Sequence, residues 1–189
     1  MAAEFERARA QLADEIEFDL LLGGINTHGT QPIGDYGRRY LLRLWREVEE
    51  TTGQKFAYRF PDEYVHNSTL PCVAIEAVRM LSGEVPFDYL HKLQTQFFLY
   101  ARDLNDRGLL LDMAAQSGVP ATDLEPLLDD SALLERVRFQ FNHAGSFGTQ
   151  ALPSLLWQAH PTAELQLFAG GYVDAQMLVE LVRNHPTMR

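Results

Sequence analysis

The side chain best suited to covalent chemistry in this sequence is Cys72, the single cysteine among 189 residues. It follows Pro71 at a predicted helix N-terminus, a position that can lower the pKa of a thiol and make it reactive. The alternative, which we favour, is a small buried hydrophobic side chain. One thiol can form a mixed disulfide, but it cannot resolve that bond without a partner thiol. The sequence as given therefore predicts neither dithiol chemistry nor an internal disulfide.

The second candidate is the pair Leu152-Pro153, which lies inside the stretch Gly148–Trp157 (GTQALPSLLW). A small, flexible lead-in ends at this pair, and the apolar run Ser154–Trp157 follows at once. Because proline cannot donate a ladder hydrogen bond, it suits the first residue of a strand. An X-Pro bond can also be cis, which would turn the loop sharply away from the strand.

Other residues with reactive side chains form no recognisable site. The six histidines show neither an H-x-x-x-H nor a Cys/His spacing that would indicate zinc. The loop Gly29–Gly34 lacks the Gly-Lys-[Ser/Thr] of a phosphate-binding loop. Ser146, Thr149 and Ser154 lie near the proline without an obvious base, although His143 is close in sequence. We therefore predict no catalytic residue and no metal ligand.

Composition limits the classes of protein that remain. Hydrophobic residues make up 46% of the chain and charged residues 22%, which suits one domain, or one domain with a large insertion. The net charge of −10 argues against nucleic acid and anionic membranes as partners. No apolar run reaches the ~18 residues of a membrane span, and the N-terminus lacks the pattern of a signal peptide. We therefore expect a cytoplasmic protein.

The elements that would position the proline loop follow from periodicity. Phe5–Ala13 predicts an amphipathic helix, and Ile16–Leu22 a parallel strand buried on both faces. A long region with helical spacing and glycine stops comes next. The predicted helices of this region are Asp35–Thr51, Cys72–Leu81, Phe87–Arg102, Asp106–Ser117, Asp123–Leu128 and Ser131–Ala144.

The C-terminal part has a different pattern. Ser154–Trp157 and Glu164–Phe168 are predicted strands, joined by a turn at His160–Ala163. Gly170-Gly171 ends the second strand, and a helix over Tyr172–His185 closes the chain. This order of loop, proline, strand, turn, strand, Gly-Gly and helix resembles the C-terminal half of a thioredoxin-like fold.

The details resemble the DsbA-like branch, which includes the FrnE-like thiol-disulfide oxidoreductases and the 2-hydroxychromene-2-carboxylate isomerases. The resemblance covers most of the chain and implies an α/β, thioredoxin-like fold with a large all-helical insertion. Residues 1–33 and 145–189 would form the thioredoxin-like core, and residues 34–144 the helical insertion. In that family the matching proline is cis and lies beside the redox motif.

The resemblance also implies what the loop binds. In related proteins the backbone before the cis-proline pairs with an extended peptide or with glutathione, by adding a strand to an exposed edge. Leu152 and Pro153 are therefore the expected substrate-binding residues. The alternative is a structural turn that only begins a strand.

The family's chemistry is absent from this sequence. Its members begin with a strand and a Cys-x-x-Cys motif, or with a serine in the glutathione-dependent branch, and neither precedes Phe5 here. The first strand of the fold is thus missing from the chain as given. Because that strand lies between two others, buried backbone groups would lose their partners. We expect a homodimer to supply the pairing, with a rearranged monomeric sheet as the alternative.

The resulting prediction is a DsbA-like, thioredoxin-fold protein related to thiol-disulfide oxidoreductases and isomerases, but redox-inactive as given. One alternative is a non-catalytic protein that binds a peptide or a thiol-containing small molecule at Leu152-Pro153. The other is a relative of the glutathione-dependent isomerases. No cofactor is predicted, although glutathione is a possible ligand.

Overall fold

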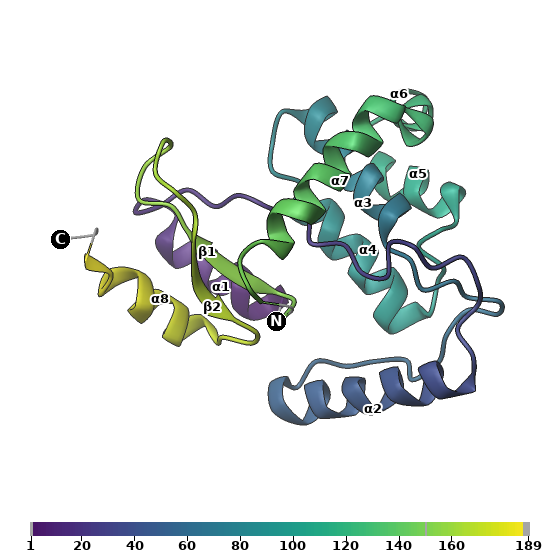
Figure 1. Cartoon of the computed structure of the whole chain (residues 1–189), viewed down its shortest axis with the longest axis horizontal. Helices are drawn as coiled ribbons and strands as arrows, with labels where there is room; N and C mark the ends of the chain where they lie inside the picture. Colours follow the sequence, from purple (N-terminus) through teal and green to yellow (C-terminus); the bar gives the residue numbers. More distant parts are fainter. Residues whose placement is uncertain (1, 150, 187–189) are drawn as a thin grey trace. The chain divides into compact units, whose positions relative to one another are not determined.

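The computed structural model describes residues 2–149 and 151–186, which are organised in two compact units (Figure 1). The first unit joins Met1–Asp19 to Asn142–Arg189, and the second spans Leu20–Phe141. The chain therefore passes between the units twice, and the second passage lies inside helix α7 (Ser131–Gly145). The units divide the chain at different points from the predicted 1–33, 34–144 and 145–189, since residues 20–33 belong to the second unit.

The first unit contains a β-hairpin, as predicted for the residues after the proline. Strand β1 (Ser154–Trp157) pairs antiparallel with β2 (Gln166–Gly170), with an irregularity after Leu155. The Ala163 amide donates to the His160 carbonyl at 2.8 Å and closes the connecting turn. The first strand has its predicted bounds, whereas the second begins at Gln166 rather than at Glu164.

Helices α1 (Ala2–Leu12) and α8 (Ala175–Arg183) pack together in this unit and complete its core. Asp174 caps α8 by accepting a hydrogen bond from the Met177 amide at 2.8 Å. The core residues share one apolar cluster that reaches both strands of the hairpin. They are Ala8, Leu12, Val173, Ala175, Leu178, Val179 and Val182, with Phe5, Ile16, Phe18, Leu155, Trp157, Phe168, Ala169 and Leu181 against them.

The prediction that Ile16–Leu22 forms a β-strand is wrong. The segment lies outside every helix and strand of the described residues, although its side chains alternate: Ile16 and Phe18 are half-buried, while Glu17 and Asp19 are exposed. Such alternating burial indicates an extended backbone, but a β-strand also requires hydrogen bonds to a neighbouring strand. In the described part of the chain the sheet consists of β1 and β2 alone.

The second unit is helical. Its centre is α3 (Thr69–Ser82), in which every residue of Pro71–Val78 is buried. Around it lie α4, α5, α6 and the 3-10 helix η1, which all contact α3. The bounds are Asp35–Thr52 for α2, Phe87–Tyr100 for α4, Arg107–Ala115 for α5, Ala121–Leu124 for α6 and Glu125–Asp129 for η1.

A cluster of aromatic side chains holds α2 in this unit. Trp45 of α2 is buried and packs on Phe56 and Phe60 of the following segment, with ring centroids 5.4 and 4.6 Å away. It also meets Phe97 and Phe98 of α4 at 5.7 Å each. Among the described residues, no helix is both long enough and apolar enough to cross a bilayer.

Candidate ligand-binding site at the Leu152–Pro153 loop

The loop before β1 is held at three points of its backbone. The Ala151 amide donates to the Thr149 hydroxyl at 3.1 Å, and the Ser154 hydroxyl donates to the Ala151 carbonyl at 2.6 Å. The Gly171 amide donates to the Pro153 carbonyl at 3.0 Å. The Leu152–Pro153 peptide bond is cis, the geometry that the family resemblance implied. The loop is thus fixed against the end of β2.

Leu152 is an exposed apolar residue of this loop. Its side chain is 53% exposed, which is unusual for leucine beside a strand, and Pro153 is also exposed. Among the described residues, no hydrogen-bond partner lies at the amide or the carbonyl of Leu152. A backbone donor and acceptor next to an exposed apolar side chain can pair with an extended segment. This arrangement can bind a ligand.

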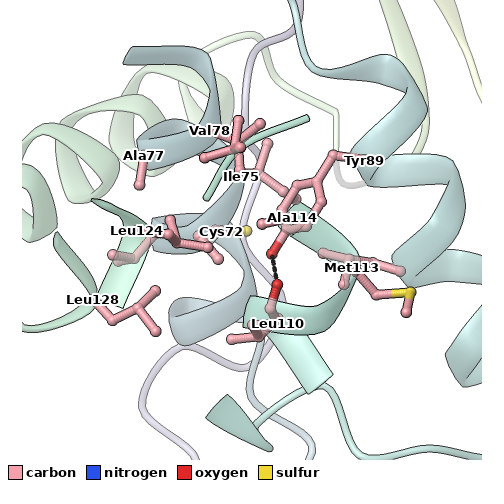
Figure 2. Close-up of a cluster of buried hydrophobic side chains, with 14 of the residues drawn as sticks. Cys72, Ile75, Ala77, Val78, Tyr89, Leu110, Met113, Ala114, Leu124 and Leu128 are labelled. Carbon is pink, nitrogen blue, oxygen red and sulfur yellow. Dashed lines mark hydrogen bonds between the residues drawn. The ribbon is translucent and has the colours of Figure 1, made fainter. Parts of the chain in front are cut away.

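Cys72, the second candidate from the sequence, lies in the second unit and belongs to its apolar core (Figure 2). Its neighbours there include Ile75, Leu110 and Leu124, and the Tyr89 hydroxyl donates to the Leu110 carbonyl at 3.1 Å. Burial raises the pKa of the thiol to about 11, although the Ser68 hydroxyl and the Gly24 amide partly offset the effect. The favoured interpretation, a buried hydrophobic side chain, is therefore the one that fits its surroundings.

The hydroxyl groups considered as nucleophiles take part in turns. Ser146 donates to the backbone carbonyl of His143 at 2.7 Å, and Ser154 is used in the loop as described above. Within residues 2–149 and 151–186, no three His, Cys, Asp or Glu side chains come together as a potential metal site.

The sequence interpretation missed an ionic cluster around Glu76 of α3, whose side chain is fully buried. Its Oε1 atom lies 2.8 Å from Arg136 Nε, and its Oε2 atom lies 3.6 Å from Arg79 Nε. The Gln140 side-chain amide donates to Oε2 at 3.0 Å. We refer to these four residues as the Glu76 cluster. A single acidic residue within the otherwise apolar run Pro71–Val78 was the signal available in the sequence.

The Glu76 cluster also fixes the chain where it enters the second unit. The Leu22 amide donates to Gln140 Oε1 at 3.1 Å, and Arg79 donates to the Leu20 carbonyl. A buried carboxylate, two guanidinium groups and one amide thus hold α3, α7 and the entering segment together.

Comparisons with known proteins give structural likenesses only. The sequence matches no model of a protein family, and a search of curated proteins finds no match either. A structure from Nitrosomonas europaea, described as a "putative protein disulfide isomerase", aligns with a TM-score of 0.85 and 22% identity, over 96% of this chain and 87% of its own. The cytosolic disulfide reductase DsbM from Pseudomonas aeruginosa aligns with a TM-score of 0.65 and 20% identity, over 95% of this chain and 88% of its own.

These alignments extend through both compact units and include the helical region, so they concern the whole architecture and not the hairpin alone. Identities of 20 and 22% are too low to transfer an activity. The chain therefore has a thioredoxin-like fold with a large helical insertion, as the likeness to DsbA-like proteins implied.

Proposed function

We propose that this protein binds extended peptides at the Leu152–Pro153 loop and that the chain as given does not catalyse dithiol–disulfide exchange. The observation that carries the proposal is the exposed Leu152, whose backbone amide and carbonyl have no partner among the described residues. The likeness to structures described as a disulfide isomerase and a disulfide reductase supports a polypeptide as the ligand. The cytosolic description of the second neighbour supports a cytoplasmic location.

Binding would combine two contributions. The Leu152 amide and carbonyl would pair with the backbone of the peptide, as in strand addition. The Leu152 side chain would lose its remaining exposure against an apolar residue of the ligand. Full burial of a leucine contributes about 1.5–3 kcal/mol, so the half that is still exposed accounts for roughly a tenfold change in affinity.

The test uses a fluorescently labelled insulin B chain with carboxymethylated cysteines, an extended polypeptide without thiols. Fluorescence anisotropy should show binding to the wild type and about tenfold weaker binding to Leu152→Asp. Met80→Asp is the matched control, because Met80 is 51% exposed but lies on α3 of the other unit. Equal affinities of wild type and Leu152→Asp would contradict the proposal.

Competition with glutathione tests the alternative, which is a relationship to the glutathione-dependent isomerases. The amide groups of this tripeptide, γ-glutamyl-cysteinyl-glycine, can form hydrogen bonds with the same amide and carbonyl of Leu152. If glutathione displaces the labelled peptide at concentrations where oxidised dithiothreitol does not, the loop recognises peptides of this size. Displacement by neither compound favours longer polypeptides as ligands.

The second half of the proposal concerns catalysis. The sequence contains one cysteine, and that thiol is buried with a raised pKa. In an insulin-reduction assay with dithiothreitol, turbidity should therefore develop at the rate of the protein-free reaction. A faster reaction that persists in Cys72→Ser would show that the chain has chemistry not described above.

A further inference from the structure

One stretch of the second unit has the opposite charge to the chain as a whole. Residues 36–46 of α2 contain four arginines and no acidic residue, whereas the net charge of the protein is −10. Arg38 is occupied within the unit, since it donates to the Ile33 carbonyl at 3.2 Å and lies over the Phe60 ring. Arg39, Arg43 and Arg46 are exposed.

Three turns of α2 combine these charges with aromatic side chains. Tyr36, Arg39, Tyr40 and Arg43 follow the i, i+3, i+4, i+7 spacing that places residues on one side of a helix; we call them the Tyr–Arg face. Tyr36 is 80% exposed and Tyr40 44%. The Arg43 guanidinium lies 5.4 Å from the centre of the Tyr40 ring, a cation–π contact that orders both side chains.

The composition of the Tyr–Arg face is that of a binding surface. Tyrosine and arginine are enriched among the residues that dominate protein–protein affinity. Arg43 also forms an ion pair with Glu47 at 3.7 Å, a length at which an exposed pair contributes little. Arg39 has no ion-pair partner among the described residues. The face is thus equipped for an acidic partner that can also cover two tyrosine rings.

The same unit carries a surface of complementary charge. Residues 108–135, which we call the acidic segment, include six acidic residues and no basic residue. All six are exposed, and they are Asp112, Asp123, Glu125, Asp129, Asp130 and Glu135. Asp129 pairs with Arg107 and Glu135 with Arg138 at the two ends of the segment, so the charge available to a partner is centred on Asp123 and Glu125. Figure 1 places α2 and α6, which carries Asp123 of the acidic segment, at opposite ends of this unit.

We propose that the acidic segment of a second copy of this chain docks on the Tyr–Arg face. The two surfaces differ, so the contact is head-to-tail and leaves an unused surface at each end of a pair. Association should therefore continue beyond the dimer as concentration rises. It should also weaken with salt, because exposed charges are screened over about 3 Å at 1 M ionic strength. The proposal does not depend on the function assigned to the Leu152–Pro153 loop.

Sedimentation velocity across a concentration series at low salt is the direct test. We expect the weight-average sedimentation coefficient to rise with concentration, and to fall to that of a monomer near 1 M sodium chloride. A monomer at every concentration in low salt would overturn the proposal. Association that is equally strong in high salt would also overturn it, and would point to pairing of strand edges between two copies.

Charge reversal then identifies the two surfaces. Arg39→Glu/Arg43→Glu should weaken self-association about tenfold or more, and so should Asp123→Lys/Glu125→Lys on the acidic segment. Arg7→Glu/Arg102→Glu changes the net charge as the first variant does but lies outside both surfaces, so it serves as the control. Circular dichroism must show that each variant is folded.

Mixing the reversed variants gives the decisive measurement. In Arg39→Glu/Arg43→Glu both surfaces are acidic, and in Asp123→Lys/Glu125→Lys the introduced lysines meet the arginines of the Tyr–Arg face, so neither variant should associate alone. In an equimolar mixture the introduced carboxylates of the first variant face the introduced lysines of the second, so association should return. If the mixture stays monomeric, the two surfaces are not partners of each other. If only an unrelated acidic protein binds the Tyr–Arg face, the second copy is likewise excluded as the occupant.

Discussion

Burial decides what the thiol of Cys72 can do. A thiol reacts as its thiolate, and an apolar surrounding disfavours that charge. The position after Pro71 near a helix N-terminus acts in the opposite direction, but the pKa of about 11 indicates that burial prevails. The same residue type at the same place on an exposed helix would be a reactive cysteine.

The raised pKa of Cys72 predicts a dependence of stability on pH. An unfolded cysteine has a pKa of ~8.5, so the folded chain keeps its proton to higher pH than the unfolded chain does. This contribution is fully present below about pH 8.5 and is lost as the pH rises towards 11. The free energy of unfolding of the wild type, relative to Cys72→Ala, should fall by about 2 kcal/mol between pH 7 and pH 10.

Urea titrations of the two proteins at both pH values measure this difference. Other groups that titrate in this range, such as lysine and tyrosine, affect both proteins equally and cancel. Iodoacetamide provides a second measurement, because the native thiol should be alkylated far more slowly than the thiol in urea. Rapid alkylation of the native protein at pH 7.5 would mean that Cys72 is accessible.

Among the elements, α3 has the greatest influence on the second unit, because it contacts several helices and contributes Glu76 to the ionic cluster. Glu76→Gln keeps the shape of the side chain but removes its charge from between Arg79 and Arg136. The Arg136 side chain is more than half exposed and stays in contact with water, whereas Arg79 is mostly buried and loses its carboxylate. Because a buried donor left without its partner costs about 1–3 kcal/mol, we expect the substitution to destabilise the protein by about 2 kcal/mol in urea unfolding.

Glu135→Gln is the matched control, because Glu135 pairs with Arg138 at 2.7 Å on the exposed side of α7. An exposed pair of this kind contributes about 0–1 kcal/mol. Equal effects of the two substitutions would mean that the Glu76 cluster is effectively hydrated. Hydrogen exchange at the Leu22 amide adds an independent readout, since that amide depends on Gln140 and should exchange faster in Glu76→Gln.

The same elements show how much of the secondary structure could be predicted from the sequence. Gly53 and Gly83 end α2 and α3 with φ of 72°, so these helix ends were readable from single residues. The hairpin was readable because Pro153 and the turn at His160 bracket an apolar run. The prediction of a strand at Ile16–Leu22 failed because the hydrophobic pattern indicates which side chains are buried. It does not indicate whether a second strand lies beside the segment.

The candidate site was only partly accessible from the sequence. Leu152 and Pro153 came from resemblance to a family, whereas the exposure of Leu152 depends on how Thr149 and Gly171 hold the loop. The Glu76 cluster joins residues from separate helices, so its pairing is a property of the tertiary structure. The positive charge of residues 36–46 could be recognised in the sequence. The side of α2 that faces solvent could not, because it is set by the burial of Trp45 in the tertiary structure.

At the level of the whole molecule, each compact unit has its own apolar core. The cluster around α3 and the aromatic cluster use residues of Leu20–Phe141, and the cluster of α1, α8 and the hairpin uses residues of the other unit. The two tryptophans of the chain are divided in the same way, with Trp45 in the second unit and Trp157 in the first.

This division predicts two separable unfolding transitions. In Trp157→Phe the remaining fluorescence reports on the second unit, and in Trp45→Phe it reports on the first. The first unit is the smaller and buries less apolar surface, so it should unfold at the lower urea concentration. Circular dichroism of the wild type should show both steps. Coincident transitions in the two variants would indicate that the units unfold as one cooperative body.

The hydrogen bond between Leu22 and Gln140 has a consequence for the ancestry of such a chain. It brings the beginning and the end of the helical unit into direct contact, 118 positions apart in sequence. A segment whose two ends meet can be acquired or lost by a single genetic insertion or deletion, because the host needs only one point of attachment. The Leu20–Leu22 region and the α7 residues near Gln140 are therefore where a shorter or a foreign helical unit could be grafted onto the hairpin and its two helices.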